Sequence, residues 1–304
     1  LRDRLHLEHQ PFGPRDGPSN LTRTPMEIVE NTLLKVTIPY SIADSAIQSI
    51  EKCELLAEYG TNRQVAIYWG HDEAERLAQI FDAGQPNPKI PDVPSPIFRD
   101  YEWPGMYTPF KHQKDTASFL SLRQRAFCFN EAGTGKTSAA IWAADYLMNL
   151  GLIKKVLVIC PLSIMQPAWQ SDIFKTAMHR TCGVAHGASS KRKKVIDENF
   201  DFTIINYDGT HVVFKELQEA RFDLIIVDEA NAYKTSTTRR WKALAKLITP
   251  STRLWMMTGT PASQSPADAY GLAKIVNPEG VPNFFTSWRD KVMNKVTLYK
   301  WAAK

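Results

Sequence analysis

The sequence predicts an α/β protein in which helices cover both faces of a parallel sheet, preceded by a smaller α/β unit. Two observations predict this fold class. From about Tyr107 onward, short apolar runs alternate with helical stretches, which is the pattern of repeated βα units. A glycine-rich loop at 130–137 also separates an apolar strand from an Ala-rich helix. In sheets of this kind the ligand binds at the carboxyl ends of the strands.

The chain divides into four regions by composition. Residues 1–25 are rich in proline, glycine and charge and are expected to form an irregular arm. Residues 26–83 carry the pattern of a small α/β accessory domain. Prolines crowd residues 84–106, which predicts a linker and a domain boundary, because proline interrupts helices and central strands. Residues 107–304 then form the larger domain.

The accessory domain is predicted from two strands and two helices. Leu33–Ile38 and Val65–Trp69 have the apolar content of strands. Ser41 with Asp44 resembles the capping box that begins a helix, and Asp72 is expected to cap a second helix.

The larger domain is predicted from five apolar runs and the helical stretches between them. The run Val156–Cys160 is continuously apolar, as in a strand buried on both faces. The other strands are expected at Ala126–Phe129, Phe202–Asn206, Leu224–Val227 and Leu254–Met257, and helices at Thr137–Leu147, Trp241–Ile248 and Ala267–Val276. Trp142 and Trp255 fall on core-facing positions.

Charge and hydropathy exclude some classes of protein. Lys and Arg number 37 against 32 Asp and Glu, a net charge of +5 that is compatible with a polyanionic partner but is shared by many other proteins. No apolar run approaches the roughly 18 residues that span a bilayer, so no membrane segment is expected. Leu1–Gln10 has no apolar core of a signal peptide. The sequence begins at Leu1 and stops at Lys304, which favours a fragment or a processed piece.

The cysteines indicate a reducing compartment. Cys53, Cys128, Cys160 and Cys182 lie far apart, and no pair has the spacing of zinc ligands. We expect free, mostly buried thiols in a cytoplasmic protein.

The segment 130–137, Asn-Glu-Ala-Gly-Thr-Gly-Lys-Thr, has the character of a phosphate-binding loop. Gly133 and Gly135 allow backbone N–H groups to approach phosphate oxygens without obstruction by a Cβ atom. Lys136 is placed to reach the β- and γ-phosphates, and the Thr137 hydroxyl to bind Mg²⁺. The full pattern has glycine at the first position, where this sequence has asparagine.

An acidic pair ends the apolar run at 222–227. A strand there would deliver Asp228 to the edge of the sheet where a metal and phosphates bind. Glu229 is then placed to orient and deprotonate an attacking water. Together with the phosphate loop, the pair predicts a P-loop domain that hydrolyses a nucleoside triphosphate with Mg²⁺.

These segments resemble the motifs of superfamily 2 helicases and ATPases, in particular the SWI/SNF-type branch. Six segments occur in the order of that family: 109–113, 133–137, 158–163 with Trp169 downstream, 204–207, 228–231 and 257–261. The resemblance implies a RecA-like first lobe that binds ATP. Within the family, the sequence most resembles helicase-like proteins of tailed bacteriophages, which implies the cytoplasm of the host cell as the location.

The resemblance implies roles for the matching positions. Gln113 would read the adenine edge, Asp228 would hold Mg²⁺, and Glu229 would be the base. The nucleotide-binding set would be Gln113, Glu131, Gly133, Thr134, Gly135, Lys136 and Thr137. Thr258, Gly259 and Thr260 would link the state of ATP to the grip on DNA. Pro161, Leu162, Ser163, Asn206 and Tyr207 would lie along a nucleic-acid backbone, although Tyr207 also fits a core position and 258–260 a simple turn.

The sequence departs from the family pattern in two places. Asn231 stands where the commonest form of the acidic motif has histidine, which leaves coupling through that side chain in doubt. Nothing after Pro261 resembles the motifs of the second RecA-like lobe, which is therefore expected beyond residue 304. That lobe supplies an arginine finger worth about 10³–10⁵ in rate in P-loop enzymes, so the chain alone is expected to bind ATP weakly and hydrolyse it slowly.

Two basic segments are ambiguous. Lys191–Lys194 would either neutralise nucleic-acid phosphates or begin a solvated helix. Lys234, Arg239 and Arg240 would either face DNA or occupy an exposed helix face.

Three functions remain open at this point. The first is the ATP-binding motor lobe of a DNA-dependent ATPase, a helicase or translocase acting on duplex DNA or a displaced strand, with RNA also possible. The second is a P-loop ATPase or kinase that does not act on nucleic acid, which fails to account for the segments at 160–163 and 258–261. The third is a fragment that acts mainly as a nucleic-acid-binding or protein-binding adaptor through residues 26–83.

Overall fold

The chain folds into two units. The computed structural model describes residues 26–83, 92–262, 265–297 and 300–304. The units comprise Leu1–Arg99 and Asp100–Lys304. The arm predicted at 1–25 and the first part of the predicted linker, 84–91, lie outside the described residues. Among the described residues, no helix combines the length and the hydropathy needed to cross a membrane.

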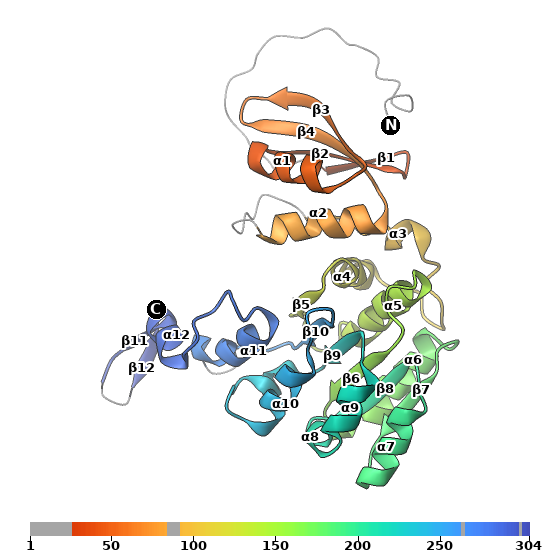
Figure 1. Ribbon diagram of the computed structural model, residues 1–304, viewed down its shortest axis with the longest axis vertical. Coiled ribbons are helices and arrows are strands. Elements are labelled where there is room, and N and C mark those ends of the chain that lie inside the picture. The colour runs from red at the N-terminus through yellow and green to blue at the C-terminus, as the bar shows by residue number, and fades with distance from the viewer. Residues whose placement is uncertain (1–25, 84–91, 263–264, 298–299) are drawn as a thin grey trace. The chain divides into compact units, whose positions relative to one another are not determined.

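The first unit is a four-stranded antiparallel sheet with two helices (Figure 1). Its strand order is β1-β2-β4-β3. Alternate residues of β2, namely Leu34, Val36 and Ile38, are fully buried, as are Ala46 and Leu77 of the helices. The bounds are β1 Met26–Val29, β2 Leu33–Pro39, α1 Tyr40–Ser49, β3 Cys53–Tyr59, β4 Asn62–Tyr68 and α2 His71–Ala83, followed by the short helix α3 Ile97–Asp100.

The first unit differs from the prediction in two ways. The strands β1 and β3 were not predicted, because they lie at the two edges of the sheet and bury few of their residues. The predicted capping box is wrong: α1 begins at Tyr40, directly after β2, so Ser41 lies within the helix and no side chain caps it. Asp72 is likewise inside α2, which begins at His71.

The second unit contains a six-stranded sheet in the order β5-β10-β9-β6-β8-β7, and every neighbouring pair of strands is parallel. The predicted fold class is therefore confirmed. The strands are β5 Arg125–Cys128, β6 Val156–Cys160, β7 Cys182–Ala185, β8 Phe202–Asn206, β9 Leu224–Val227 and β10 Arg253–Met257. The short strand β7 was not predicted, because its Cys-Gly-Val-Ala sequence carries little strand signal.

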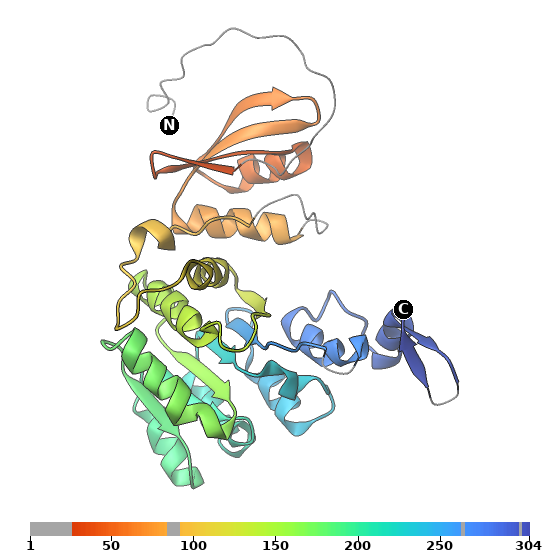
Figure 2. The ribbon, with the colours of Figure 1, turned by 180° about the vertical axis from the view of Figure 1, so that it is seen from behind.

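Helices cover both faces of this sheet (Figures 1 and 2). On one face, Ile159, Ile225 and Met256 of the strands share a core with Leu217 and Leu244 of the helices. The helices are α4 Lys111–Ser121, α5 Lys136–Asn149, α6 Ser171–Thr176, α7 Ser189–Asp197, α8 Gly209–Val212, α9 Phe214–Ala220, α10 Arg239–Leu247, α11 Ala269–Val276 and α12 Phe285–Val292, with the hairpin strands β11 Met293–Lys295 and β12 Trp301–Ala303.

Helix α5 is the buried helix of the second unit. Its residues from Ala139 to Met148 are all buried, including Trp142, which was predicted to be a packing residue. Trp255 of β10 is buried as well, as predicted. An Ala-rich helix suits this place, since small side chains let it lie close to its neighbours.

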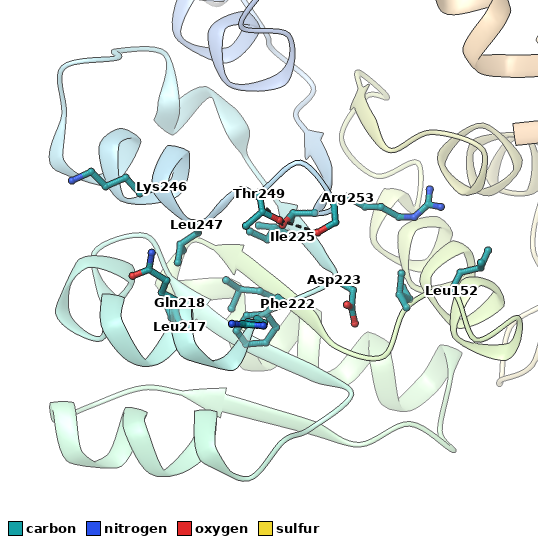
Figure 3. A pocket seen from close by; sticks show the side chains of 15 residues that line it. Leu152, Leu217, Gln218, Phe222, Asp223, Ile225, Lys246, Leu247, Thr249 and Arg253 are labelled. Carbon is teal, nitrogen blue, oxygen red and sulfur yellow. Dashed lines mark hydrogen bonds between the residues drawn. The ribbon is translucent and has the colours of Figure 1, made fainter. Parts of the chain in front are cut away.

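Most of the predicted motifs and a cavity lie at opposite edges of the parallel sheet, one formed by the carboxyl ends of the strands and the other by their amino ends. The loops that carry the predicted motifs from 133–137 onward follow the carboxyl ends of strands, which meet at one edge because the strands are parallel, whereas the segment 109–113 leads into α4. A cavity of about 630 Å³ lies at the opposite edge, lined by residues such as Ile153, Asp223 and Arg253 that begin or precede β6, β9 and β10 (Figure 3). The Asp223 carboxylate there accepts the backbone N–H groups of Lys154 and Lys155 at 2.8 and 3.0 Å. No predicted site residue lines this cavity.

The buried carboxylate of Asp145 in α5 forms hydrogen bonds with side chains outside this helix. Asp145 is fully buried, and its oxygens accept from the Tyr101 hydroxyl at 2.6 Å and from Arg180 Nε at 2.5 Å. His179 Nε2 lies 2.9 Å from the same carboxylate. Burial and the neighbouring Asp145 charge raise the pKa of Tyr101 well above its ordinary value, which keeps the hydroxyl a donor.

We expect Asp145→Asn to lower the free energy of unfolding by roughly 3 kcal/mol, because it leaves the guanidinium of a buried pair uncompensated. Urea unfolding followed by circular dichroism measures this loss. The matched control is Asp197→Asn at an exposed position of α7, which should change the midpoint very little. Equal midpoints for the two variants would contradict a structural role for the Asp145 carboxylate.

Candidate nucleotide-binding site

The glycine-rich loop joins β5 to α5 in a conformation that needs both of its glycines. Gly133 and Gly135 have φ angles of 79° and 74°, in the left-handed region that suits glycine. A Cβ atom at Gly135 would also overlap the side-chain amide of Gln113. Gly135 is the N-cap residue of α5, so the free N–H groups and the positive end of the helix dipole lie at the loop. The loop is therefore a cradle for an anion such as a polyphosphate.

Polar side chains of the loop fold back onto its own backbone. Lys136 Nζ donates to the carbonyl oxygen of Glu131 at 3.2 Å, and Thr134 Oγ1 donates to the same oxygen at 2.8 Å. Asn130, at the position where the common pattern has glycine, donates through Nδ2 to Thr116 Oγ1 at 2.8 Å. The asparagine thus anchors the start of the loop to α4 instead of adding to the phosphate cradle.

Gln113 lies directly beside the phosphate loop. Its Oε1 accepts the Phe110 N–H at 2.9 Å and caps α4, and its Nε2 lies 3.4 Å from the carbonyl oxygen of Thr134. His112 Nε2 is 3.0 Å from the same oxygen. The amide of Gln113 must exchange these bonds to read an adenine, and that role stays a prediction.

The acidic pair follows β9 at the same edge of the sheet. Asp228 is only 6% exposed, and its Oδ1 accepts the Glu229 N–H at 2.9 Å while its Oδ2 accepts Trp169 Nε1 at 2.9 Å. Burial raises the pKa of Asp228, whereas these two hydrogen bonds and the positive charge of Lys136 act in the opposite direction. Because β5 and β9 both pair with β10 in the parallel sheet, the loop after β5 and the acidic pair after β9 lie at the same edge of the sheet.

The donor set at this edge fits Mg²⁺ bound together with a triphosphate. Among the described residues there is no cluster of His, Cys, Asp and Glu able to hold a metal by itself. Mg²⁺ is commonly bound by one or two protein oxygens plus phosphate oxygens and water. The hydroxyl of Thr137 and the carboxylate of Asp228 are the groups that would supply those protein oxygens.

The segment 258–260 packs against the start of the phosphate loop. Thr258 is fully buried, and its N–H donates to the carbonyl oxygen of Cys128 at 3.0 Å. Its Oγ1 accepts the Thr260 N–H at 3.2 Å. A Cβ atom at Gly259 would lie 3.6 Å from the carbonyl oxygen of Asn130. The structure therefore brings this segment together with the nucleotide loop, and its coupling role stays a prediction.

The residues predicted to lie along nucleic acid fall into two groups. Leu162 and Ser163 are exposed at the carboxyl end of β6, and Pro161 is partly exposed beside them. Asn206 and Tyr207 instead direct their polar groups to protein: Asn206 Oδ1 accepts from Arg192 at 2.9 Å, and the Tyr207 hydroxyl donates to the backbone of the acidic pair. A contact with nucleic acid at these positions stays a prediction.

The basic segment 191–194 is largely used by the fold. Arg192 is 8% exposed and donates to the carbonyl oxygens of Ala185 and Gly187 at 2.7 and 2.9 Å. Lys193 forms an ion pair with Glu216. Only Lys191 and Lys194 of this segment remain as exposed cations with no ion-pair partner among the described residues. The solvated-helix interpretation therefore fits better than a phosphate cluster of four cations.

Trp169 is the site residue whose contact the sequence did not reveal. It is fully buried in a π-helical turn, Met165–Gln170, that follows the 3-10 turn Leu162–Ile164 after β6. Its indole reaches the carboxylate of Asp228, which is 59 positions away in the sequence. Local sequence patterns do not predict a contact between residues so far apart in the chain.

The fold and the site define a P-loop domain of the α/β class. The comparison with protein families identifies the branch: the model of the SNF2-related domain matches residues 112–302, and the chain belongs to this family. The predicted resemblance to SWI/SNF-type proteins of superfamily 2 is thereby confirmed. The predicted link to bacteriophage proteins stays a prediction.

Curated relatives are similar over part of their length. The chain is 28% identical over 176 residues to SWI/SNF-related matrix-associated actin-dependent regulator of chromatin subfamily A-like protein 1 of Xenopus tropicalis, covering 57% of this chain and 18% of the relative. It is 28% identical to the chromatin-remodeling ATPase INO80 of Schizosaccharomyces pombe, covering 53% of this chain and 11% of the relative. The uncharacterized ATP-dependent helicase YqhH of Bacillus subtilis is 22% identical, and the match covers 69% of this chain and 36% of the relative. The chain thus spans less than half of each of these proteins.

A solved structure supports the fold. The SWI2/SNF2 ATPase core of Sulfolobus solfataricus, determined in complex with double-stranded DNA, superposes with a TM-score of 0.54 at 23% identity. The match covers 62% of this chain and 39% of that chain. At this identity the likeness establishes the shared fold of the ATPase core.

Proposed function

We propose that residues 107–304 are the ATP-binding lobe of a DNA-dependent ATPase that couples hydrolysis to movement on DNA, with residues 26–83 as an accessory domain. One observation carries the proposal: the phosphate loop, the acidic pair and the exposed segment 161–163 gather at one edge of a parallel sheet. Membership of the SNF2-related family supports it, and so do relatives named as chromatin-remodeling ATPases and helicases.

The roles of the chain's own residues follow from the geometry. The N–H groups of the loop and the end of α5 bind the triphosphate, and Lys136 moves from its backbone acceptor to the β- and γ-phosphates. Mg²⁺ held by Thr137 and Asp228 would neutralise charge on the phosphates. Glu229 orients a water and removes its proton, while Asp228 would hold the metal.

A basic hollow beside the acidic pair is the proposed surface for the DNA backbone. It has a volume of about 440 Å³ and is lined by His211, Asn231, Lys234, Arg239 and Arg240, among others. Arg240 is paired with Asp208 at 3.1 Å and Lys234 with Asp268 at 3.6 Å, so these two cations are partly neutralised. Arg239 is exposed at the first turn of α10.

We expect Arg239→Ala to weaken DNA binding and to reduce the slope of log Kd against log salt by about one, as the loss of one phosphate contact does. Fluorescence anisotropy with a labelled duplex over a salt series measures both. Lys246→Ala is the matched control, because Lys246 is an exposed cation near the other end of α10 and lines the cavity at the opposite edge. Equal effects of the two variants would show that only net charge matters.

The function as a whole is tested by ATP hydrolysis and DNA binding in the 304-residue chain. We propose slow turnover, because the chain covers 39% of the Sulfolobus ATPase core and nothing after Pro261 resembles the second lobe that supplies the arginine finger. Duplex DNA and single strands of DNA and RNA are compared as activators. ATP binding without any affinity for a polyanion at low salt would contradict the motor and favour a small-molecule kinase.

A further inference from the structure

Two side chains from distant segments hold the acidic pair. The Tyr207 hydroxyl lies 2.6 Å from the carbonyl oxygen of Asp228 and 3.1 Å from that of Glu229, and it donates to this pair of oxygens. Trp169 Nε1 donates to the carboxylate of Asp228 at 2.9 Å. The backbone and the carboxylate of the acidic motif are thus each fixed by a separate residue.

The backbone conformation of Glu229 requires stabilising contacts of this kind. Its φ of 47° and ψ of 52° place it in the left-handed region, which residues other than glycine rarely adopt. The surrounding contacts must maintain this conformation. The hydroxyl of Tyr207 contacts the carbonyl groups on both sides of the Glu229 N–Cα unit, so it acts on the backbone that aims the Glu229 carboxylate.

Tyr207 itself was predicted to lie along nucleic acid, and Trp169 lies a few residues after the segment 161–163 of the same prediction. Trp169 follows β6 and the exposed residues Leu162 and Ser163 through two consecutive helical turns. Tyr207 directly follows β8 and lies beside the basic hollow, where Arg240 sits over its ring at 5.6 Å. A shift of either segment would therefore be transmitted to the acidic pair through one hydrogen bond.

We propose that Tyr207 and Trp169 are positioning residues that carry contact with nucleic acid to the acidic pair and so control hydrolysis. The inference rests on the proposed function for its nucleic-acid part. That Tyr207 and Trp169 position Asp228 and Glu229 follows from the hydrogen bonds themselves and does not depend on the proposed function. Neither residue touches the nucleotide in this account, since both act through the acidic motif.

The chain offers a matched pair of variants for this test. Tyr207→Phe removes only the hydroxyl and keeps the ring, which packs edge-on against Tyr233 with centroids 5.6 Å apart. Tyr233→Phe removes the neighbouring hydroxyl, which is buried and has no hydrogen-bond partner among the described residues. The two variants therefore make the same chemical change at adjacent rings, and only one of them releases the acidic pair.

The first readout needs no catalysis. Hydrogen exchange followed by mass spectrometry reports the amides of the peptide covering 228–234, where Ala232 N–H donates to the Glu229 carbonyl oxygen at 3.1 Å. We expect faster exchange in Tyr207→Phe than in wild type and an unchanged rate in Tyr233→Phe. Equal exchange rates of this peptide in the two variants would overturn the positioning role, and this result does not depend on which substrate the protein hydrolyses.

The second readout is kinetic. Tyr207→Phe should lower kcat by up to about tenfold, the effect of one lost hydrogen bond, with the KM for ATP nearly unchanged. It should also reduce the ratio of DNA-stimulated to basal turnover, whereas Tyr233→Phe should keep that ratio. An intact ratio in Tyr207→Phe would overturn the coupling.

A third variant tests the carboxylate side of the hold. Trp169→Phe removes the indole donor, and we expect it to raise the Mg²⁺ concentration needed for half-maximal binding of a fluorescent ATP analogue. Unchanged Mg²⁺ dependence in a folded Trp169→Phe protein would contradict its part. If wild type shows neither turnover nor DNA binding while exchange still responds to Tyr207→Phe, the proposed function fails and the holding role stands.

Discussion

Replacing Glu229 by Gln is expected to lower the rate of ATP hydrolysis by about 10²–10⁴, the usual contribution of a general base, and to leave nucleotide binding intact. The amide keeps the size and backbone position of the side chain but does not accept the proton of the attacking water. Asp228, the predicted metal ligand, is unchanged in this variant. Initial rates of phosphate release and the Kd of a fluorescent ATP analogue give the two quantities.

The control for this variant is the same change at an exposed glutamate. Glu198 is the C-cap residue that directly follows α7 and is exposed, so Glu198→Gln should hydrolyse ATP at the wild-type rate. If Glu229→Gln hydrolysed ATP as fast as this control, the assignment of the base would be wrong. Loss of both binding and turnover would point to a folding defect, which a thermal melt of the variant detects.

Replacing Lys136 by Ala is expected to weaken ATP binding by roughly 10²-fold or more, because charge-assisted hydrogen bonds to the phosphates are lost. The ammonium group already lies at the loop, 3.2 Å from the carbonyl oxygen of Glu131, so little rearrangement is needed to reach a phosphate. Isothermal titration with ATP and Mg²⁺ measures the change.

Lys246→Ala serves as the control here too, since Lys246 lies at the opposite edge of the sheet. It should bind ATP as wild type does. A Lys136→Ala protein with unaltered affinity for ATP would show that the triphosphate does not occupy the glycine-rich loop. Inorganic tripolyphosphate as a competitor separates the phosphate contacts from those to the base, because it displaces ATP only through the loop.

Much of the sheet was predictable because its strands are buried on both faces. Val156–Cys160, Phe202–Asn206 and Leu224–Val227 stand out as apolar runs, and the structure has strands with these same bounds. The strands that were missed, β1, β3, β7, β11 and β12, all lie at the edges of their sheets. An edge strand buries fewer residues, so its sequence pattern is weaker.

The sequence led to a predicted site only where the residues concerned are neighbours in the chain. The phosphate loop and the acidic pair each occupy one strand and the turn after it, so their spacing is visible in the chain. The contacts of Trp169 and Tyr207 with Asp228, and of Arg192 with Asn206, join separate segments. The same holds for Asp145, whose partners Tyr101 and Arg180 lie on either side of it in the chain.

The sequence alone determined the α/β class, and it was sufficient to predict the phosphate loop with Lys136 and Thr137 and the acidic pair, because a strand, a turn and the next helix are contiguous. The tertiary structure decided which strands are neighbours, in the order β5-β10-β9-β6-β8-β7. That order sets β9 beside β6 and β6 beside β8, which places Trp169 and Tyr207 against Asp228. Strand order depends on packing between segments far apart in the chain, and local patterns do not encode it.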